Sequence, residues 1–201
     1  MSINLMESSG QRAAKEFVIK NNTLLSYNGN DTDVIIPDGV VVIGKAAFKN
    51  KSVENVTLPS TVVMISDEAF AFCYALSSIT LPDSIVYIGA KAFYEDTGLL
   101  SIELPNNLTT LGERAFYKCD QIEEINIPGT LKVVQPMTFY ECLLLKYVDI
   151  EEGVEVICNG AFYKTAVERI QLPKSTVYAV GKEFLEPYRL NEDSSTNYFN
   201  Y

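Results

Sequence analysis

Apolar and polar positions alternate along this chain in a pattern that repeats every 22 or 23 residues. One copy reads Ile79-Thr80-Leu81-Pro82, continues through two further isoleucines and ends at Ala92-Phe93. A phenylalanine recurs at the last position of every copy: Phe48, Phe70, Phe93, Phe116, Phe139, Phe162 and Phe184. A fixed period in this range is typical of a solenoid, in which each coil buries its apolar side chains only by stacking on its neighbours.

The spacing within a copy predicts the path of one coil. Apolar residues two apart, such as Ile79 and Leu81, predict a strand with one buried face. The proline follows where no hydrogen-bond donor is needed. The next isoleucines predict a second extended segment, and the Ala-Phe pair predicts a short helical or irregular return with its ring inside. We therefore expect an α/β repeat solenoid that is rich in strands, with about seven coils over residues 34–186.

Residues 76–93 fit the pattern L-x-x-I-x-L-P-x-x-[IVL]-x-x-I-G-x-x-A-F, and Cys73 stands three residues after Phe70. This sequence pattern resembles the BspA-like leucine-rich repeat, and the resemblance covers about three quarters of the chain. The resemblance implies a leucine-rich-repeat fold and a non-catalytic protein–protein interaction module. It also suggests a cell-surface, adhesin-type role.

The two ends of the repeat array differ from the repeats. Residues 1–16 form a polar segment. Apolar runs on both sides of Asn21-Asn22 predict a capping hairpin within residues 17–33, because the first coil of a solenoid needs a cap over its core. Residues 187–201 are not another repeat, and we expect a C-terminal cap or a tail there.

The formal net charge of −10 changes the list of possible partners. An acidic chain repels nucleic-acid phosphates, so no nucleic acid is expected, whereas a basic protein partner is allowed. Residues 1–7 lack the basic and apolar regions of a signal peptide, and no apolar run is long enough for membrane insertion. The chain as it stands is expected in the cytoplasm, or at the cell surface if it is a fragment of a longer protein.

The outward positions of the first strand are one candidate binding surface. In the later coils they carry Glu103, Glu124, Tyr147, Asp149 and Arg169. An ordinary solvated face would account for these charges, and so would a site for a basic segment. The second interpretation gives an alternative function, an intracellular adaptor or inhibitor that binds a basic partner through an acidic concave face.

Two more ladders could take part in binding. The residues after four successive phenylalanines are Tyr94, Tyr117, Tyr140 and Tyr163, which could form a recognition strip or simply pack with their hydroxyls in water. The second extended segment places Val42, Met64, Tyr87, Thr110, Val133, Val156 and Tyr178 in one column. If exposed, this column would be an apolar stripe suited to self-association; it could equally reflect a preference for good strand formers.

The sequence lacks several common kinds of catalytic site. Its carboxylates are plentiful, with Glu103 and Glu124 the nearest to a paired-carboxylate site, but the repeat spreads them along a regular surface with no obvious pocket. There is no histidine, which excludes a histidine-based triad, and no glycine-rich phosphate-binding phrase. Without histidine or a C-x-x-C pair we expect no metal site and no cofactor. Cys73, Cys119 and Cys142 share one repeat position and are expected to be buried free thiols, although Cys119 and Cys142 belong to adjacent coils, where a disulfide is geometrically possible. We therefore expect a protein that is not an enzyme.

Overall fold

The computed structural model describes residues 16–167, 170 and 172–179. Its strands are β1 (Phe17–Lys20), β2 (Thr23–Tyr27), β3 (Asp33–Ile35), β4 (Val42–Ile43), β5 (Asn55–Thr57), β6 (Met64–Ile65), β7 (Ser78–Thr80), β8 (Tyr87–Ile88), β9 (Thr110–Leu111), β10 (Glu124–Ile127), β11 (Val133–Val134), β12 (Tyr147–Ile150), β13 (Val156–Ile157) and β14 (Tyr178–Ala179). The predicted segment 1–16, apart from Glu16, and the predicted cap or tail 187–201 lie outside the described residues.

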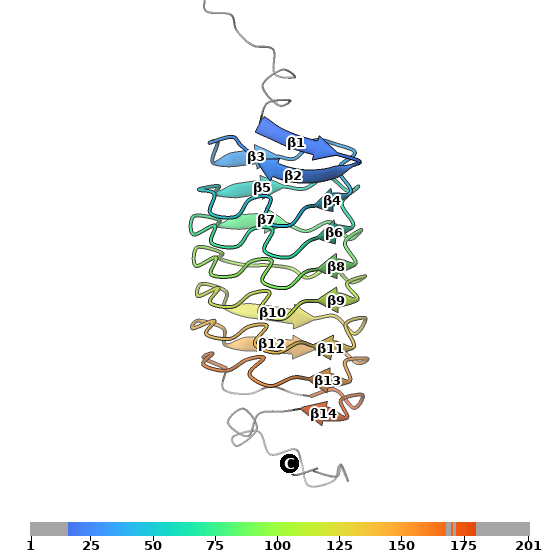
Figure 1. The fold of residues 1–201 in the computed structure, drawn as a ribbon. Helices are drawn as coiled ribbons and strands as arrows, with labels where there is room; N and C mark the ends of the chain where they lie inside the picture. Colours follow the sequence, from blue (N-terminus) through green and yellow to red (C-terminus); the bar gives the residue numbers. More distant parts are fainter. Residues whose placement is uncertain (1–15, 168–169, 171, 180–201) are drawn as a thin grey trace, which may run out of the picture.

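The strands stack as successive coils of one solenoid of about seven turns, so the predicted strand-rich repeat fold is confirmed (Figure 1). We number the coils by their first strand, so that β3, β5 and β7 open coils 1 to 3, and β10 and β12 open coils 5 and 6. These strands form the first-strand face. The strands β4, β6, β8, β9, β11, β13 and β14 form the second-strand face.

Parallel pairing places equivalent residues of neighbouring coils side by side. Val56 pairs with Ile79, and Ile125 pairs with Val148. Because the register equals the sequence period, every repeat position becomes a column along the solenoid. For this reason, a residue type that recurs at one repeat position forms a stripe on the surface or a ladder in the core.

The returns between coils are turns, and the helical alternative for them is wrong in the described part of the chain. In residues 68–72 the amides of Glu68, Phe70 and Phe72 donate to carbonyls of the next coil at 2.8–3.0 Å, and the amides between them donate to carbonyls three residues earlier. A helix is prevented because Glu68 and Phe72 have left-handed backbones, with φ of 56° and 63°. Equivalent left-handed residues occur at Ala46, Asn50, Lys91, Glu95, Arg114, Lys118, Met137, Glu141, Gly160 and Lys164.

A continuous stack of phenylalanine rings fills the core. The centroid distances along the stack are 5.0–5.4 Å from Phe48 to Phe162, and the rings at the middle of the stack are nearly parallel. All of these rings are buried, together with the apolar strand residues of each coil. The predicted interior position of the repeat phenylalanine is thus observed in every described coil that carries it.

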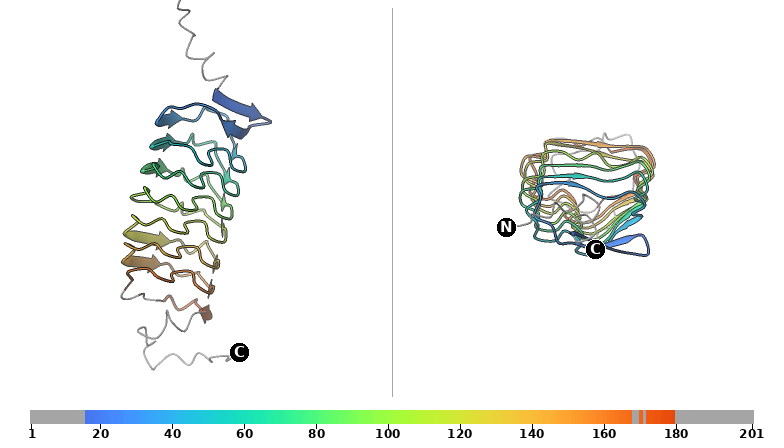
Figure 2. Two further views of the ribbon diagram at one scale, coloured as in Figure 1. Left: turned by 60° about the vertical axis from the view of Figure 1, so that its left-hand side comes forward. Right: turned by 90° about the horizontal axis from the view of Figure 1, so that it is seen from above.

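A hairpin covers the N-terminal end of this core (Figure 2). Its strands β1 and β2 are antiparallel, and left-handed Asn21 and Asn22 form the turn between them. Tyr27 continues the ring stack, with its centroid 5.1 Å from Phe48 and 5.1 Å from Phe17. Strand β2 also pairs with β4, so the hairpin is joined to the second-strand face.

Both faces are interrupted at coil 4. Residues 101–104 have the repeat pattern of a first strand, yet within the described part of the chain no backbone hydrogen bond joins them to β7 or β10. The second-strand face is divided at the next step, between β9 and β11. The hydroxyl of Thr130 spans this seam and shares its one hydrogen between the carbonyls of Asn106 and Leu108, at 2.9 and 2.8 Å. Because of this seam, the first-strand face of coils 3 to 6 is not a continuous hydrogen-bonded sheet, in contrast with that of coils 1 to 3.

Candidate functional site

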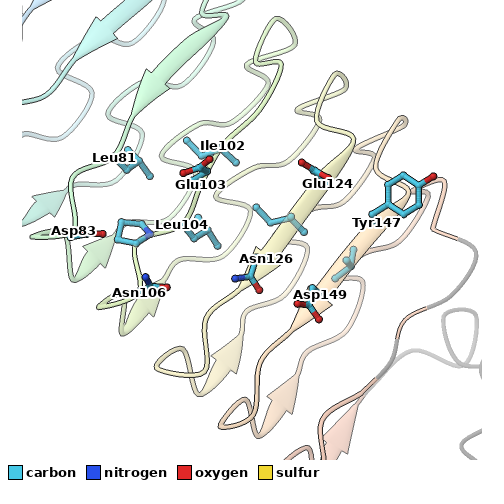
Figure 3. Close-up of a pocket in the computed structure, with 13 residues that line it drawn as sticks. Leu81, Asp83, Ile102, Glu103, Leu104, Asn106, Glu124, Asn126, Tyr147 and Asp149 are labelled. Atoms are coloured by element: carbon cyan, nitrogen blue, oxygen red, sulfur yellow. The ribbon is translucent and has the colours of Figure 1, made fainter.

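A hollow of about 620 Å³ lies on the first-strand face where the sheet is interrupted. We call it the first-strand groove (Figure 3). Its lining residues are Leu81, Asp83, Ile102, Glu103, Leu104, Pro105, Asn106, Glu124, Ile125, Asn126, Tyr147, Val148 and Asp149. Coils 3 to 6 therefore all contribute to it, and it follows the axis of the solenoid.

Four of the five predicted residues of the acidic face line this groove. Glu103, Glu124 and Asp149 come from coils 4, 5 and 6, and all three are exposed. Tyr147 is 66% exposed and pairs in register with Glu124. The fifth residue, Arg169, lies outside the described residues. Whether these side chains bind a partner stays a prediction.

Among the described residues, the three groove carboxylates have no intramolecular partner. Across residues 16–167, 170 and 172–179, no hydrogen bond or ion pair involves the side chains of Glu103, Glu124 or Asp149. Coils are about 4.8 Å apart, so the carboxylates of Glu103 and Asp149, which share one column two coils apart, stand roughly 10 Å from each other along the groove. Glu124 lies between them in the adjoining column.

Other acidic residues beside the groove have a structural use. Glu151 accepts from the amide of Asn126 at 2.9 Å and from the backbone of Gly129 at 3.0 Å. These hydrogen bonds, first that from Asn126, lower the pKa of Glu151. Glu152 accepts from the backbone of Lys174 and Ser175, which lowers its pKa as well. These carboxylates hold turns of neighbouring coils together and are therefore not free for a partner.

Sequence reasoning missed Asp83 and Asn106 as residues of the groove. Each follows the repeat proline directly, and each is exposed at the edge of the hollow. The sequence feature that could have predicted them is their shared repeat position, which continues the outward positions of the first strand around the turn. Asp83 adds a further carboxylate to the groove from coil 3.

The predicted tyrosine ladder is a tightly stacked column of half-buried rings. Tyr94, Tyr117 and Tyr140 stack at 4.8 and 5.0 Å with interplanar angles of 5° and 2°, and Tyr163 follows at 5.2 Å. Lys118 lies over Tyr117, at 5.7 Å from the ring centroid to Nζ. Since the rings cover each other's faces, they expose mainly their edges. A binding role for this ladder stays a prediction.

Lysines and glutamates border the tyrosine ladder and neutralise each other. Lys164 donates to Glu141 at 2.6 Å, and Lys118 lies 3.7 Å from Glu141 and 4.0 Å from Glu95. The Lys164 contact lowers the pKa of Glu141, as expected for an ion pair. The return side thus carries mixed and paired charge, in contrast with the unpaired carboxylates of the groove.

The valine-rich column on the second-strand face is only partly exposed. Val42, Met64 and Tyr87 are half-buried, while the adjoining Val63 and Val86 are 37% and 42% exposed. Farther along, the adjoining column becomes polar, and Lys132 and Glu155 form an ion pair at 3.6 Å. The apolar stripe is therefore shorter than the column, and self-association through it stays a prediction.

The three repeat cysteines are buried free thiols, as predicted. Each donates to the carbonyl of a phenylalanine in the preceding coil: Cys73 to Phe48, Cys119 to Phe93 and Cys142 to Phe116, at 3.0, 3.1 and 3.1 Å. Burial raises the pKa of all three thiols far above the ordinary cysteine value. Cys158 is free too, but only half-buried.

We expect a thiol reagent to modify Cys158 of the native protein well before the other three cysteines. The thiolate is the reactive form, and access as well as a raised pKa protects the buried thiols. Labelling should reach all 4 cysteines only after denaturation. A Cys158→Ser variant is the control: rapid labelling of the folded variant would contradict the burial of the ladder.

The described residues form neither a metal-binding cluster nor a membrane-spanning helix. No group of three or more cysteine, aspartate or glutamate side chains in them could hold a metal ion. None of the helices that they form is long and apolar enough to cross a membrane.

Comparisons with known proteins agree with this geometry. The structure is similar to that of a leucine-rich cell-surface protein from Faecalibacterium prausnitzii, with a TM-score of 0.72, 26% identity and coverage of 81% of this chain and 48% of that one. A leucine-rich repeat protein from Bacteroides ovatus has a TM-score of 0.51 at 26% identity, with 79% and 56% coverage. This chain spans about half the length of the F. prausnitzii structure.

A leucine-rich repeat protein of T. pallidum has the same fold, with a TM-score of 0.60 at 21% identity and coverage of 89% of this chain and 90% of that one. A comparison with curated protein sequences gave no match. The model of the BspA type leucine rich repeat region, in 6 copies, matches residues 19–145 and 63–186. With the repeat phrase, the coil register and this match in agreement, the chain belongs to the BspA-type leucine-rich-repeat family.

Proposed function

We propose that this chain is a non-catalytic protein-interaction module that binds a basic, extended segment of a partner protein in the first-strand groove. The observation that carries the proposal is the set of three carboxylates, Glu103, Glu124 and Asp149, which surround one hollow and have no partner within the described part of the chain. Several acidic side chains elsewhere on the solenoid, among them Glu141 and Glu151, are used within the protein, whereas these three gather around one groove. Its family consists of repeat proteins that act as binding scaffolds.

The spacing of the carboxylates fits an extended segment that runs along the solenoid axis. In an extended chain of the polyproline II type, which has three residues per turn and rises about 3.1 Å per residue, side chains three residues apart lie on the same side and roughly 9 Å apart, close to the separation of Glu103 and Asp149. Arginine is the favoured contact because its guanidinium can bind a carboxylate through two hydrogen bonds. Tyr147 offers an exposed ring at the rim, on which a guanidinium can stack.

The strength of charge–charge contacts in such an open groove should depend on the salt concentration. The carboxylates are exposed, so each contact is screened and worth about 0.2–1 kcal/mol. Affinity then comes from several contacts at once and from burial of the tyrosine ring. We expect binding of a basic partner to weaken as the ionic strength is raised.

Two versions of this function differ in the cell compartment in which the protein would act. The F. prausnitzii relative is described as a cell-surface protein, and this favours an adhesin-type module on the outside of the cell. The alternative is an intracellular adaptor or inhibitor that uses the same groove. Protease treatment of intact native cells distinguishes the two, because only a surface-exposed protein is degraded while the cells remain closed.

A photo-crosslinking amino acid placed at Ser101 tests the site itself. Ser101 is exposed at the start of the coil 4 segment that leads into the groove, and Thr109 is an exposed control position on the other face. Bait protein is incubated with native cell lysate and, separately, with extracellular matrix. We expect the Ser101 variant to crosslink a protein through a basic segment, and salt to suppress the crosslink. Equal crosslinking from Thr109 would place the interaction elsewhere.

A further inference from the structure

One buried position departs from the cysteine ladder. The residue three after the repeat phenylalanine is cysteine at Cys73, Cys119 and Cys142, but it is Asp96 in coil 3. Asp96 is completely buried, with a relative exposure of 0%. Lys51 and Thr165 hold the same position in coils 1 and 6 but are only partly buried, whereas the fully buried residues there are the three thiols. A fully buried carboxyl group at this position therefore needs a physical explanation.

The two oxygens of Asp96 have different surroundings. Oδ1 accepts from the backbone amide of Cys73 at 2.8 Å. Oδ2 is buried and has no hydrogen-bond partner among the described residues. The titratable groups that face it are the thiols of Cys73 and Cys119, with Lys51 beyond the first and Asp120 beyond the second. None of the cations among the described residues makes an ion pair with Asp96. An ionised carboxylate would be poorly stabilised there.

The carbonyl of Phe70 is the acceptor that fits the second oxygen. The carbonyls of Phe48, Phe93 and Phe116 each accept one backbone amide and one thiol. The carbonyl of Phe70, which has the same place in the ladder relative to Asp96, accepts only the backbone amide of Cys73, at 3.1 Å. The amide of Cys73 donates both to this carbonyl and to Asp96 Oδ1, so the carboxyl group and the carbonyl lie close together, and both would be acceptors unless Asp96 carries a proton.

We propose that Asp96 is a neutral carboxylic acid in the folded protein, that its Oδ2–H donates to the Phe70 carbonyl, and that the stacking of coil 3 on coil 2 is consequently sensitive to pH. The proton replaces the thiol proton of the neighbouring coils, so the ladder stays complete. Loss of this proton leaves a buried charge next to an acceptor and weakens the junction.

The sign of the pH effect follows from the burial of the group. Burial raises the pKa of Asp96 well above its ordinary value, while in the unfolded chain it is about 3.9. The contribution of Asp96 to stability is complete below the unfolded-state pKa and is lost as the pH rises toward the folded-state pKa. Within this window, each pH unit multiplies the unfolding constant by up to about ten.

The loss of stability should increase local opening first in the segment beside the groove. Asp96 shortly precedes residues 101–104, the segment that lacks strand hydrogen bonds on both sides. This segment carries Glu103 into the groove. Amide hydrogen exchange of residues 96–104 should therefore accelerate with pH more than the intrinsic exchange chemistry requires, and more than in β5 or β6.

The test compares the full chain with Asp96→Asn from pH 4 to pH 8 by urea unfolding. The asparagine amide can donate to Phe70 and still accept from Cys73 at every pH. We expect the ratio of the wild-type unfolding constant to that of D96N to rise steadily with pH, up to tenfold per unit. Asp38→Asn, at an exposed turn, is the matched control and should leave the pH profile of the wild type unchanged.

A second readout observes the carboxyl group directly. In protein labelled with 13C at aspartate carboxyls, the signal that disappears in D96N should keep the chemical shift of a protonated acid at pH 6. Titration of this signal near the ordinary aspartate value would overturn the proposal, and so would parallel pH profiles for wild type and D96N. If D96N does not fold, Asp96→Cys restores the residue of the neighbouring coils and should show the same loss of pH dependence.

Discussion

Replacing Phe93 by alanine should lower the free energy of unfolding by about 3–5 kcal/mol. Phe93 is fully buried in the middle of the ring stack, with its centroid 5.3 Å from Phe70 and 5.1 Å from Phe116. The substitution removes both contacts and leaves a cavity between two coils. Because each coil is stabilised only by its neighbours, a defect at the centre weakens both halves of the solenoid.

Urea unfolding followed by circular dichroism measures this effect. Tyr74→Ala is a suitable control because that ring is 57% exposed, and its loss should change stability by only about 0.5 kcal/mol. A loss below roughly 1 kcal/mol for Phe93→Ala would mean that the ring stack is not the main support of the fold. A lower slope of the transition would indicate that the two halves unfold separately.

The periodic part of the fold could be predicted because local pattern and global register coincide here. Once Val56 and Ile79 have equivalent positions in a 23-residue repeat, parallel pairing follows, and with it every column. The hairpin was predictable too, since Asn21 and Asn22 tolerate the left-handed backbone that its turn requires. These inferences needed no knowledge of long-range contacts beyond the repeat itself.

The seam at coil 4 could not be predicted from local sequence. Ser-Ile-Glu at residues 101–103 has the same alternation as Ser-Ile-Thr at 78–80, yet only the second forms a strand. Hydrogen bonding between coils depends on their spacing, which is set by the whole stack. The form of the returns was ambiguous for a similar reason: their left-handed residues include lysine, glutamate and arginine, which give no local signal for such a backbone.

The candidate site could be predicted as a surface but not as a groove. The repeat places Glu103, Glu124, Tyr147 and Asp149 on one face, and the structure has all four around one hollow. The sequence could not show that the hollow exists, because it depends on the seam. It could not separate the unpaired carboxylates from Glu151, which is hydrogen-bonded to Asn126, since only the three-dimensional contacts make that distinction.

Reversing the charge of the groove should weaken binding of a basic partner by on the order of a hundredfold. In a variant with Glu103→Lys, Glu124→Lys and Asp149→Lys, each contact worth up to about 1 kcal/mol is lost, which together amounts to roughly two factors of ten. Repulsion between the new lysines and the basic segment adds to this loss. Titration calorimetry with the partner identified by crosslinking gives the affinities.

The control for this prediction must carry the same net charge. Asp33→Lys, Asp38→Lys and Glu54→Lys change three exposed carboxylates in coil 1 and at the start of coil 2, outside the groove. If the groove itself binds the partner, this control retains most of the affinity at moderate salt, because screening limits charges more than about 10 Å away. Equal weakening of both variants would show that the partner responds to the overall negative charge. In that case the unpaired carboxylates of the groove would confer solubility, and the binding surface would have to be sought elsewhere on the solenoid.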